Sequence, residues 1–350
     1  MATLLVGVPE AAPLRAEGYR VAVTGDQARP DGTTIFGDIG LARLSAIGID
    51  WEVIDVPDPV MTSAQLRNFD AVLVMGGRAI DPSSLAGTRI RHVARFGAGF
   101  DSIDTAACTS AGAVLTNAPD AVRRPMAHSA LALVLALAHN LVIKDRLVRE
   151  GRWSERTNWQ GRGLAGATVG VVGLGGIGTE TARIFRALGV DVVAYNRAPK
   201  TELAQELGIR QLPLHEVASL SDFLVIAVAG NPGTAGLVDR SVIAAMHPDA
   251  YLVNLARGVV VDEAALIEAL RDGSIRGAAL DVFQQEPIEM DNPLLQMENV
   301  VLSPHSLCWT DGFAAAVADS AISAIIDVAE GRKPQHPVNP EVLDRLGEPA

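Results

Sequence analysis

Three polar residues in the second half of the chain, Arg257, Glu286 and His305, each come shortly after a run of apolar residues. Arginine carries a permanent planar charge that suits a carboxylate lying next to a carbonyl. Histidine is the usual general acid or base near neutral pH, and a hydrogen-bonded glutamate would stabilise its imidazolium form and raise its pKa. Together the three types suit the binding of a small acid with a carboxylate next to a carbonyl, and proton transfer to or from its oxygen. Arg257 would bind the carboxylate and polarise the carbonyl, while His305, paired with Glu286, would supply or remove the proton.

Each of these residues also has a structural interpretation. Arg257 could form a surface ion pair, Glu286 could end a strand before Pro287, and His305 could be a core histidine with satisfied hydrogen bonds. Their position argues for function, because open α/β sheets bind ligands at the carboxyl ends of their strands.

A glycine-rich turn supplies the natural partner for such chemistry. The apolar run 168–172 leads directly into Gly173-Leu174-Gly175-Gly176-Ile177-Gly178, and a helical pattern follows over 179–188. The spacing G-x-G-x-x-G between a strand and a helix is typical of dinucleotide binding. Gly173 would permit the tight turn, Gly175 the close approach of a pyrophosphate, and Gly178 the packing of helix on strand. The alternative is a purely architectural turn. The residues predicted to bind the cofactor here are Gly173, Gly175, Gly176, Ile177 and Gly178.

The next apolar run ends at Tyr195, where an NAD-binding chain normally has an acidic residue for the ribose 2′-hydroxyl. This chain has Asn196 and Arg197 instead, with Lys200 close behind. A 2′-phosphate would be attracted by the two cations. We therefore expect NADP(H) to be preferred, with NAD(H) as the alternative if Arg197 and Lys200 are ordinary solvated residues.

The elements that must position these residues can be traced as alternating strand and helix patterns. In the second half the apolar runs lack alternation, which is typical of parallel strands buried on both faces. Those strands are predicted at 168–172, 190–195, 223–228, 251–255, 277–282 and 300–302. In the first part shorter runs predict strands at 3–6, 51–56, 71–75, 92–96 and 113–115, with helices at 38–47 and 104–111.

Two long helices and an arm complete the organisation. One helix is predicted from Arg124-Pro125 to about Glu150, and another over 310–330, followed by a proline-containing tail that should pack on the first block. Directly after the first of these helices, residues 151–166 form a polar, glycine-rich arm that is long for a compact loop. It is either a disordered loop or an arm that embraces a second subunit, and Trp153 and Trp159 favour the second interpretation.

Composition limits the classes of protein to which this chain can belong. The chain has 350 residues, which favours two domains, and 49% of them are hydrophobic, which is enough to build packed cores. A net charge of −12 makes nucleic acid and anionic membranes poor partners. Two cysteines cannot build a disulfide framework, and no cluster indicates a metal site. Neither a signal peptide nor a membrane span is indicated, so we expect a cytoplasmic protein.

The motifs together resemble the D-isomer-specific 2-hydroxyacid dehydrogenase family. Those that carry the resemblance are the glycine-rich turn, Val253–Gly258, Leu280–Pro287, Leu302–His305 and Ala94–Asp104. The resemblance implies two doubly wound parallel-sheet domains of Rossmann or flavodoxin type, with the active site in the cleft between them. The substrate domain would be 1–118 with 310–350, and the dinucleotide domain 119–309, including a dimerisation arm at about 125–166.

The resemblance also implies roles for further residues. The backbone amides of Ala98 and Gly99 would hold the substrate carboxylate, and Asp281 would contact the nicotinamide amide or serve the structure. Thr234 fits the family pattern on the cofactor side, although the surrounding 227–230 segment departs from it. Trp309 would either line the substrate pocket or pack beside it.

The predicted function is therefore an NAD(P)-dependent 2-oxo acid reductase acting on the CH–OH group, such as a glyoxylate or hydroxypyruvate reductase, working as a homodimer without a metal. Two alternatives stay open. One is a non-catalytic protein that senses nicotinamide cofactors, and the other is an enzyme like phosphite dehydrogenase. Glu286 argues against a formate dehydrogenase, which has glutamine at that position.

Overall fold

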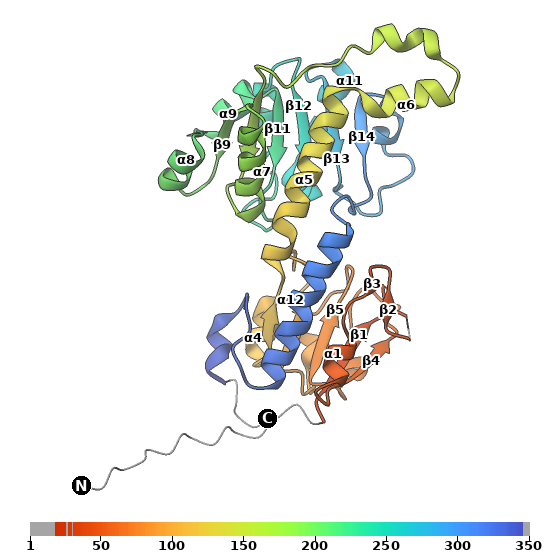
Figure 1. The fold of residues 1–350 in the computed structure, drawn as a ribbon, viewed down its shortest axis with the longest axis vertical. Coiled ribbons are helices and arrows are strands. Elements are labelled where there is room, and N and C mark those ends of the chain that lie inside the picture. The colour runs from red at the N-terminus through yellow and green to blue at the C-terminus, as the bar shows by residue number, and fades with distance from the viewer. Residues whose placement is uncertain (1–17, 26, 30, 346–350) are drawn as a thin grey trace, which may run out of the picture. The chain divides into compact units, whose positions relative to one another are not determined.

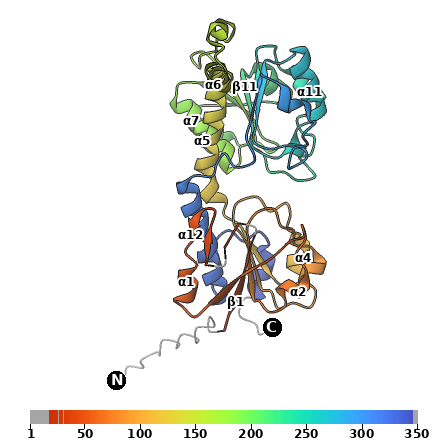
Figure 2. The ribbon, with the colours of Figure 1, turned by 90° about the vertical axis from the view of Figure 1, so that its right-hand side faces the viewer.

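The computed structural model describes residues 18–345 apart from 26 and 30. The chain divides into two compact units, one formed by Met1–Ala118 with Ala314–Ala350 and the other by Pro119–Phe313. The second boundary lies four residues beyond the predicted 309/310 position. Each unit has its own parallel sheet with helices on both faces, which confirms the predicted fold class (Figures 1 and 2).

The first unit contains a five-stranded sheet in the order β4-β1-β5-β6-β7, and every pair in it is parallel. Its strands are β1 (Arg20–Thr24), β4 (Asp50–Ile54), β5 (Ala71–Val74), β6 (His92–Arg95) and β7 (Val114–Thr116). Its helices are α1 (Ala42–Ser45), α2 (Ser63–Leu66), α3 (Pro82–Leu85), α4 (Thr105–Ser110) and most of α12 (Asp311–Ala329), and β2 (Thr33–Thr34) pairs with β3 (Gly37–Asp38) outside the sheet. Figure 2 shows α1 and α12 on one face of the sheet and α2 and α4 on the other.

Strand β1 corrects the sequence analysis, which placed no strand at 20–24. Val21, Ala22 and Val23 are fully buried, and β1 lies between β4 and β5. Polar residues interrupt the sequence on both sides, and only β-branched Val21, Val23 and Thr24 signal the strand. The strand predicted at 3–6 falls outside the described residues. The predicted helix at 38–47 shrinks to the four residues of α1.

The tail after α12 packs on β7. The Val338 amide donates to the Leu115 carbonyl over 2.7 Å, and the Asn339 side chain accepts from the Leu115 amide over 2.7 Å. Residues far apart in the chain thus close one edge of this sheet.

His92 on β6 makes the stability of the first unit depend on pH. It is fully buried, its Nε2 lies 2.8 Å from Thr116 Oγ1, and burial lowers its pKa to about 3. The unfolded chain takes up a proton on this side chain below about 6.5, whereas the folded chain does not until about pH 3. Stability is therefore complete above pH 6.5 and falls as the pH drops, by about 1.4 kcal/mol per pH unit from this residue alone.

We expect His92→Gln to flatten that dependence. Urea midpoints measured from pH 7 to pH 5 should fall steeply for the parent protein and less for the variant. The exposed His215, replaced in the same way, is the matched control. Parallel pH profiles for parent protein and His92→Gln would contradict the prediction.

The second unit contains a seven-stranded parallel sheet in the order β10-β9-β8-β11-β12-β13-β14. Its strands are β8 (Thr168–Val172), β9 (Asp191–Tyr195), β10 (Arg210–Gln211), β11 (Phe223–Ile226), β12 (Tyr251–Asn254), β13 (Gly277–Leu280) and β14 (Val300–Leu302). Its helices are α5 (Pro119–Ala138), α6 (Leu141–Arg149), α7 (Gly176–Ala187), α8 (Thr201–Leu207), α9 (Leu214–Leu220), α10 (Arg240–Ala245) and α11 (Glu263–Asp272), with short 3₁₀ turns η1 (Trp153–Asn158), η2 (Gly258–Val260) and η3 (Pro293–Gln296). Figure 2 shows α5 and α7 on one side of this sheet and α11 on the other.

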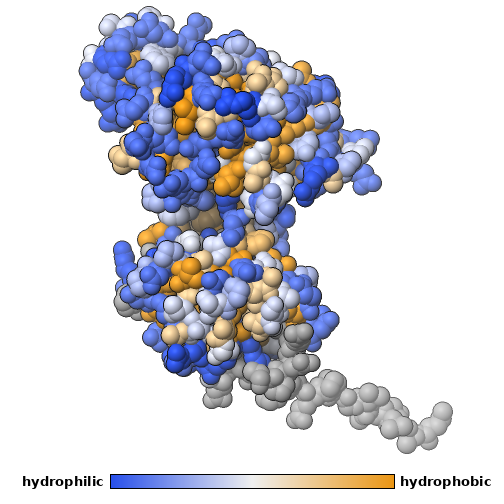
Figure 3. Space-filling view, turned by 180° about the vertical axis from the view of Figure 1, so that it is seen from behind, coloured by the Kyte–Doolittle hydropathy of each residue, from blue (hydrophilic) through white to orange (hydrophobic). Residues whose placement is uncertain are grey.

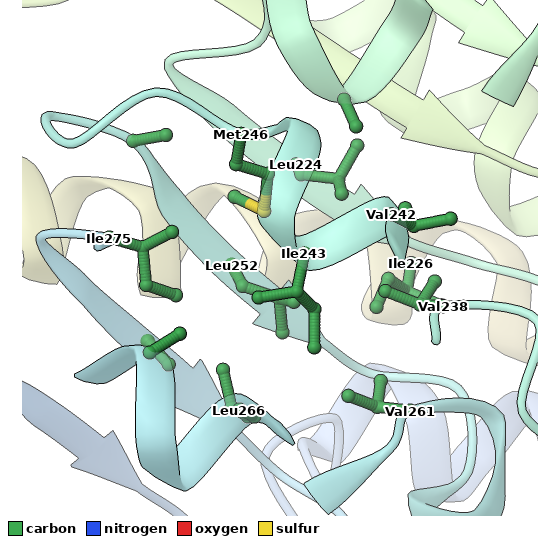
Figure 4. Close-up of a cluster of buried hydrophobic side chains, with 14 of the residues drawn as sticks. Leu224, Ile226, Val238, Val242, Ile243, Met246, Leu252, Val261, Leu266 and Ile275 are labelled. Carbon is green, nitrogen blue, oxygen red and sulfur yellow. The ribbon is translucent and has the colours of Figure 1, made fainter. Parts of the chain in front are cut away.

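One face of this sheet carries a continuous apolar core (Figure 4). Leu224 and Ile226 on β11 and Leu252 on β12 point into it, and Val242 and Ile243 on α10 pack against them. Because α5 and α7 cover the opposite face, β11 and β12 are buried on both sides, which explains their uninterrupted apolar sequence.

The prediction of one long helix from Pro125 to Glu150 is wrong in two respects. The helix begins six residues earlier, at Pro119, and it stops at Ala138, after which α6 starts anew at Leu141. Asn140 marks the break with a φ of 52°, a conformation that asparagine tolerates well. Its side-chain amide donates to the carbonyls of Trp159 and Gln160. The returning arm therefore supplies hydrogen bonds that a continuous helix could not offer.

The arm itself is ordered rather than structureless. Arg152 forms ion pairs with Glu150 and Glu155, and the 3₁₀ turn η1 follows. Its end is fixed by Arg162, which lies 2.6 Å from the buried Asp222 at the start of β11. Trp153 stays 62% exposed, so the predicted embrace of a second subunit stays a prediction.

The surface seen in Figure 3 is mostly hydrophilic, with apolar patches between the polar residues. Helices α5 and α12 are long and apolar enough to cross a membrane, but about half of each is buried in the protein, as in core helices of globular proteins.

Candidate active site

The glycine-rich turn between β8 and α7 has the shape of a diphosphate cradle. Gly173 has a φ of 101°, which only glycine adopts readily, and its amide donates to the Tyr195 carbonyl over 2.7 Å. A Cβ on Gly178 would lie 1.8 Å from the Gly173 carbonyl oxygen, so any side chain there would open the turn. A Cβ on Gly175 would meet nothing within 4 Å, which leaves its outer side open to a ligand.

The first turn of α7 supplies donors for that ligand. No side chain caps the helix at Gly175, so its first amides, those of Gly176, Ile177 and Gly178, have no partner within the helix. Uncapped amides at a helix N-terminus attract anions. The residues present thus fit the diphosphate of a nicotinamide dinucleotide.

Arg123 in the first turns of α5 adds a cation that the sequence analysis missed. A Cβ on Gly176 would lie 2.5 Å from Arg123 Nε, so the guanidinium rests directly on the turn, where it also pairs with Asp120. The available signal is that Arg123 directly precedes Arg124-Pro125, where the sequence predicts the start of a helix.

The three residues predicted to select the cofactor at the end of β9 separate into two groups. Asn196 accepts a hydrogen bond from the Leu174 amide over 2.9 Å, and Lys200 donates to the Leu174 carbonyl over 2.8 Å. Both side chains therefore brace the glycine-rich turn. Arg197 is exposed and makes no hydrogen bond or ion pair with the described residues, and its Nη1 lies beside Gly233.

Thr234 closes the turn that follows β11. Its hydroxyl donates to the Ala229 carbonyl over 2.7 Å and accepts from the Asn231 amide over 3.0 Å. This side chain thus shapes the loop beside Arg197.

Glu286 and His305 form a direct pair. His305 Nδ1 lies 2.7 Å from Glu286 Oε2, and Glu286 Oε1 accepts from the Phe283 amide over 3.0 Å. Partial burial raises the pKa of Glu286, but the hydrogen bonds from His305 and Phe283 and the charges of His305 and Arg257 outweigh it, so the net shift is downward. The carboxylate is therefore ionised throughout the neutral range. It fixes the orientation of the imidazole and leaves Nε2 for a ligand.

Asp281 holds the backbone that follows His305. This buried carboxylate accepts from the amides of Ser306 and Leu307 over 3.1 and 3.3 Å. The sequence predicts either contact with the nicotinamide amide or a structural role for Asp281, and these contacts are structural. Burial of the Cys308 thiol and, as a smaller cause, the charge of Asp281 raise the pKa of that thiol to about 11.

Arg257 extends from the turn after β12. Buried Asn254 shapes this turn, because its side chain accepts from the Ala256 amide and donates to the Arg257 carbonyl, both over 3.0 Å. A Cβ on Gly230 would lie 2.4 Å from Arg257 Cγ, so the glycine makes room for the arginine stem. The charge of Arg257 reaches Glu286 and lowers its pKa. The three predicted catalytic residues therefore come together at the carboxyl ends of β12, β13 and β14.

An apolar pocket of about 530 Å³ opens beside the Glu286–His305 pair. Trp309 does not line it and is 43% exposed. The residues lining the pocket are Phe283, Glu286, Pro287, Ile288, Leu295, Leu302, Ser303, Pro304 and His305.

Ala98 and Gly99 belong to the first unit, in the loop after β6. Neither backbone amide donates to any of the described residues, so both are available to a carboxylate. Within the part of the chain that the structure describes, no three His, Cys, Asp or Glu side chains gather in a way that could hold a metal ion.

The fold and these motifs agree with comparisons to known proteins. Residues 131–306 match the NAD binding domain of the D-isomer specific 2-hydroxyacid dehydrogenases. A glyoxylate reductase of Thermococcus onnurineus is 37% identical over 287 residues, which cover 80% of this chain and 86% of the relative. A D-3-phosphoglycerate dehydrogenase of Mycobacterium bovis is 38% identical over 292 residues, covering 83% of this chain but only 54% of the relative.

Among solved structures, the NADPH-dependent glyoxylate/hydroxypyruvate reductase of Sinorhizobium meliloti in complex with NADP and malonate superposes with a TM-score of 0.79. The two sequences are 30% identical, and the match covers 92% of this chain and 97% of the reductase chain. The chain belongs to the D-isomer specific 2-hydroxyacid dehydrogenase family. Its relatives are oxidoreductases that act on CH–OH groups with nicotinamide cofactors.

Proposed function

We propose that this protein is an NADPH-dependent reductase of small 2-oxo acids of the glyoxylate or hydroxypyruvate type. The observation that carries the proposal is the Glu286–His305 pair, with 2.7 Å between Nδ1 and Oε2, within reach of the charge of Arg257. The matched glyoxylate reductases and the NADP-bound neighbour support the substrate class and the cofactor.

A nicotinamide cofactor held at the glycine-rich turn, residues 173–178, would supply the hydride for the α-carbon of the bound acid. Arg257 pairs with the carboxylate and polarises the carbonyl through its planar fork. His305 donates a proton from Nε2 to the developing alkoxide, while Glu286 holds Nδ1 and stabilises the imidazolium. In the oxidation direction the neutral imidazole acts as the base.

The test is a panel of acids run with NADPH and NADH in parallel, following nicotinamide absorbance. It includes glyoxylate, hydroxypyruvate, pyruvate, D-3-phosphoglycerate and phosphite. Turnover of a 2-oxo acid above all others supports the proposal. Cofactor binding without turnover of any of them would instead favour a sensor of nicotinamide cofactors, and oxidation of phosphite would favour the other alternative.

Arg197 gives the cofactor preference a structural test. We expect Arg197→Met to raise the Kd of NADPH about tenfold or more and to leave that of NADH unchanged, because only the 2′-phosphate would lose a charge-assisted hydrogen bond. Kd values come from quenching of protein fluorescence by each cofactor. Arg183→Met, an exposed arginine on α7 that pairs with Glu180, is the control. An equal effect on both cofactors, or a lower Kd for NADH in the parent protein, would overturn the NADPH assignment.

We further propose a homodimer and a cytoplasmic location. The dimer is supported by exposed apolar side chains on α6 and the arm, including Leu141, Val148 and Trp153, which are 61%, 59% and 62% exposed. Light scattering of the purified protein and of a Trp153→Glu variant tests the assembly. A monomeric parent protein would refute it.

A further inference from the structure

The loop after β6 is held by its carbonyl oxygens. The Phe96 carbonyl accepts from Arg95 Nη1 over 2.6 Å, and the Gly99 carbonyl accepts from Arg95 Nε over 2.8 Å. The Ala98 carbonyl accepts from Asn117 Nδ2 over 2.7 Å. A fourth carbonyl, that of Gly97, accepts from the Ala118 amide over 2.8 Å. Four successive carbonyls of the loop are thus bound within the first unit.

This arrangement determines where the amides of the loop point. In a trans peptide the carbonyl of one residue and the N–H of the next point in opposite directions. When the carbonyls of Gly97, Ala98 and Gly99 are held inward, the amides of Ala98, Gly99 and Phe100 must face outward. None of these three amides donates to a described residue. Successive outward amides of this kind form a concave site for an anion.

Arg95 is the centre of the arrangement. It is half-buried, and besides its two contacts in the loop its Nη1 donates to the Val74 carbonyl at the end of β5 over 3.2 Å. One planar guanidinium thus ties the loop to two neighbouring strands, which the single ammonium of a lysine could not reproduce. Gly97, with a φ of 135°, lets the loop turn over this side chain.

We propose that Arg95 and Asn117 are positioning residues that set the loop amides for the substrate carboxylate. Neither side chain would touch the substrate. The inference rests on the proposed function, because it assigns to these amides the carboxylate of a 2-oxo acid. The Arg95 guanidinium would lie on the inner side of the loop, and its positive charge would also increase the attraction of an anion to the outward-facing amides.

The experiment uses the full-length protein with Arg95→Met, Arg95→Lys and Asn117→Ala. Arg43→Met is the matched control, because Arg43 also bridges two elements of the first unit, bonding Asp319 and Ser323, but lies outside the loop. We measure KM and kcat for glyoxylate, the inhibition constant of oxalate, and the Kd of NADPH. Melting temperatures show whether each variant is folded.

We expect Arg95→Met to raise both the KM for glyoxylate and the inhibition constant of oxalate by about ten- to a hundredfold. The reason is that the loop loses the charge-assisted hydrogen bonds from Arg95 that orient its amides. kcat should change much less, and the Kd of NADPH should stay within twofold, because the cradle belongs to the other unit. Asn117→Ala should show a smaller change of the same kind. In a further variant, Arg95→Ala, which leaves room for a small cation, added guanidinium ion but not urea should partly restore oxalate binding.

Oxalate binding that stays within twofold of the parent value in folded Arg95→Met and Asn117→Ala would overturn the proposal. If Arg95→Met does not fold, Arg95→Lys and Asn117→Ala decide the question by the same readouts. A parent protein that turns over no 2-oxo acid refutes the proposed function instead, and that result is visible before any variant is made.

Discussion

Replacing His305 with asparagine should lower kcat for 2-oxo acid reduction by about 10²–10⁴. The imidazole bonds to Glu286 Oε2 through Nδ1, which leaves Nε2 as the atom that would deliver the proton in the proposed reaction. Asparagine is the suitable replacement because His305 has a φ of 52°, a left-handed conformation in which most other residues are strained. The variant therefore removes the acid while leaving the backbone in place.

The measurement is kcat at saturating glyoxylate, together with the Kd of NADPH. Because the glycine-rich turn does not contact His305, the cofactor constant should stay within twofold. His215→Asn is the control, since His215 lies in the same unit and bonds only Ser241 at an exposed position. Activity of His305→Asn within a few-fold of the parent would show that another group moves the proton.

The second large effect concerns Arg257. Arg257→Met should lower kcat/KM by about 10²–10⁴, because two charge-assisted hydrogen bonds to the acid, each about 1.5–3 kcal/mol, are lost. KM should rise and kcat should fall, because the same guanidinium would both bind the carboxylate and polarise the carbonyl. Arg257→Lys should recover only part of the loss, because an ammonium cannot make the bidentate contact.

Arg240→Met provides the comparison for Arg257, because this exposed arginine in the same unit pairs with Glu268 and does not line the pocket beside His305. The readouts are KM and kcat for glyoxylate and the Kd of NADPH. An Arg257→Met variant that keeps kcat and raises only KM would restrict the role of Arg257 to binding.

Residues that lie at strand ends could be predicted well from the sequence. Arg257, Glu286 and His305 follow apolar runs that became β12, β13 and β14, and parallel topology brings such ends to one edge of the sheet. The glycine-rich turn was equally predictable, because its glycines are required by contacts that repeat wherever this turn occurs.

The sequence is least informative where a side chain bonds to backbone atoms that lie far away in the chain. Nothing in the sequence says that Lys200 and Asn196 would both bond to Leu174, and their predicted role toward the ribose stays a prediction. Asn140 ends the long helix because the arm returns to its side chain, a contact that local propensity does not contain. Arg95 lies within a predicted motif, but its bonds to the carbonyls of Phe96 and Gly99 depend on how the loop folds back over its side chain.

The bonds from Asp281 affect how the segment after His305 can tolerate changes of sequence. Asp281 grips the amides of Ser306 and Leu307 rather than their side chains. The side chains from 306 to 309 can therefore be exchanged without releasing the backbone that carries His305. Sequence changes at these positions would thus leave the main chain next to His305 where it is, and this segment can diverge among relatives without moving the imidazole.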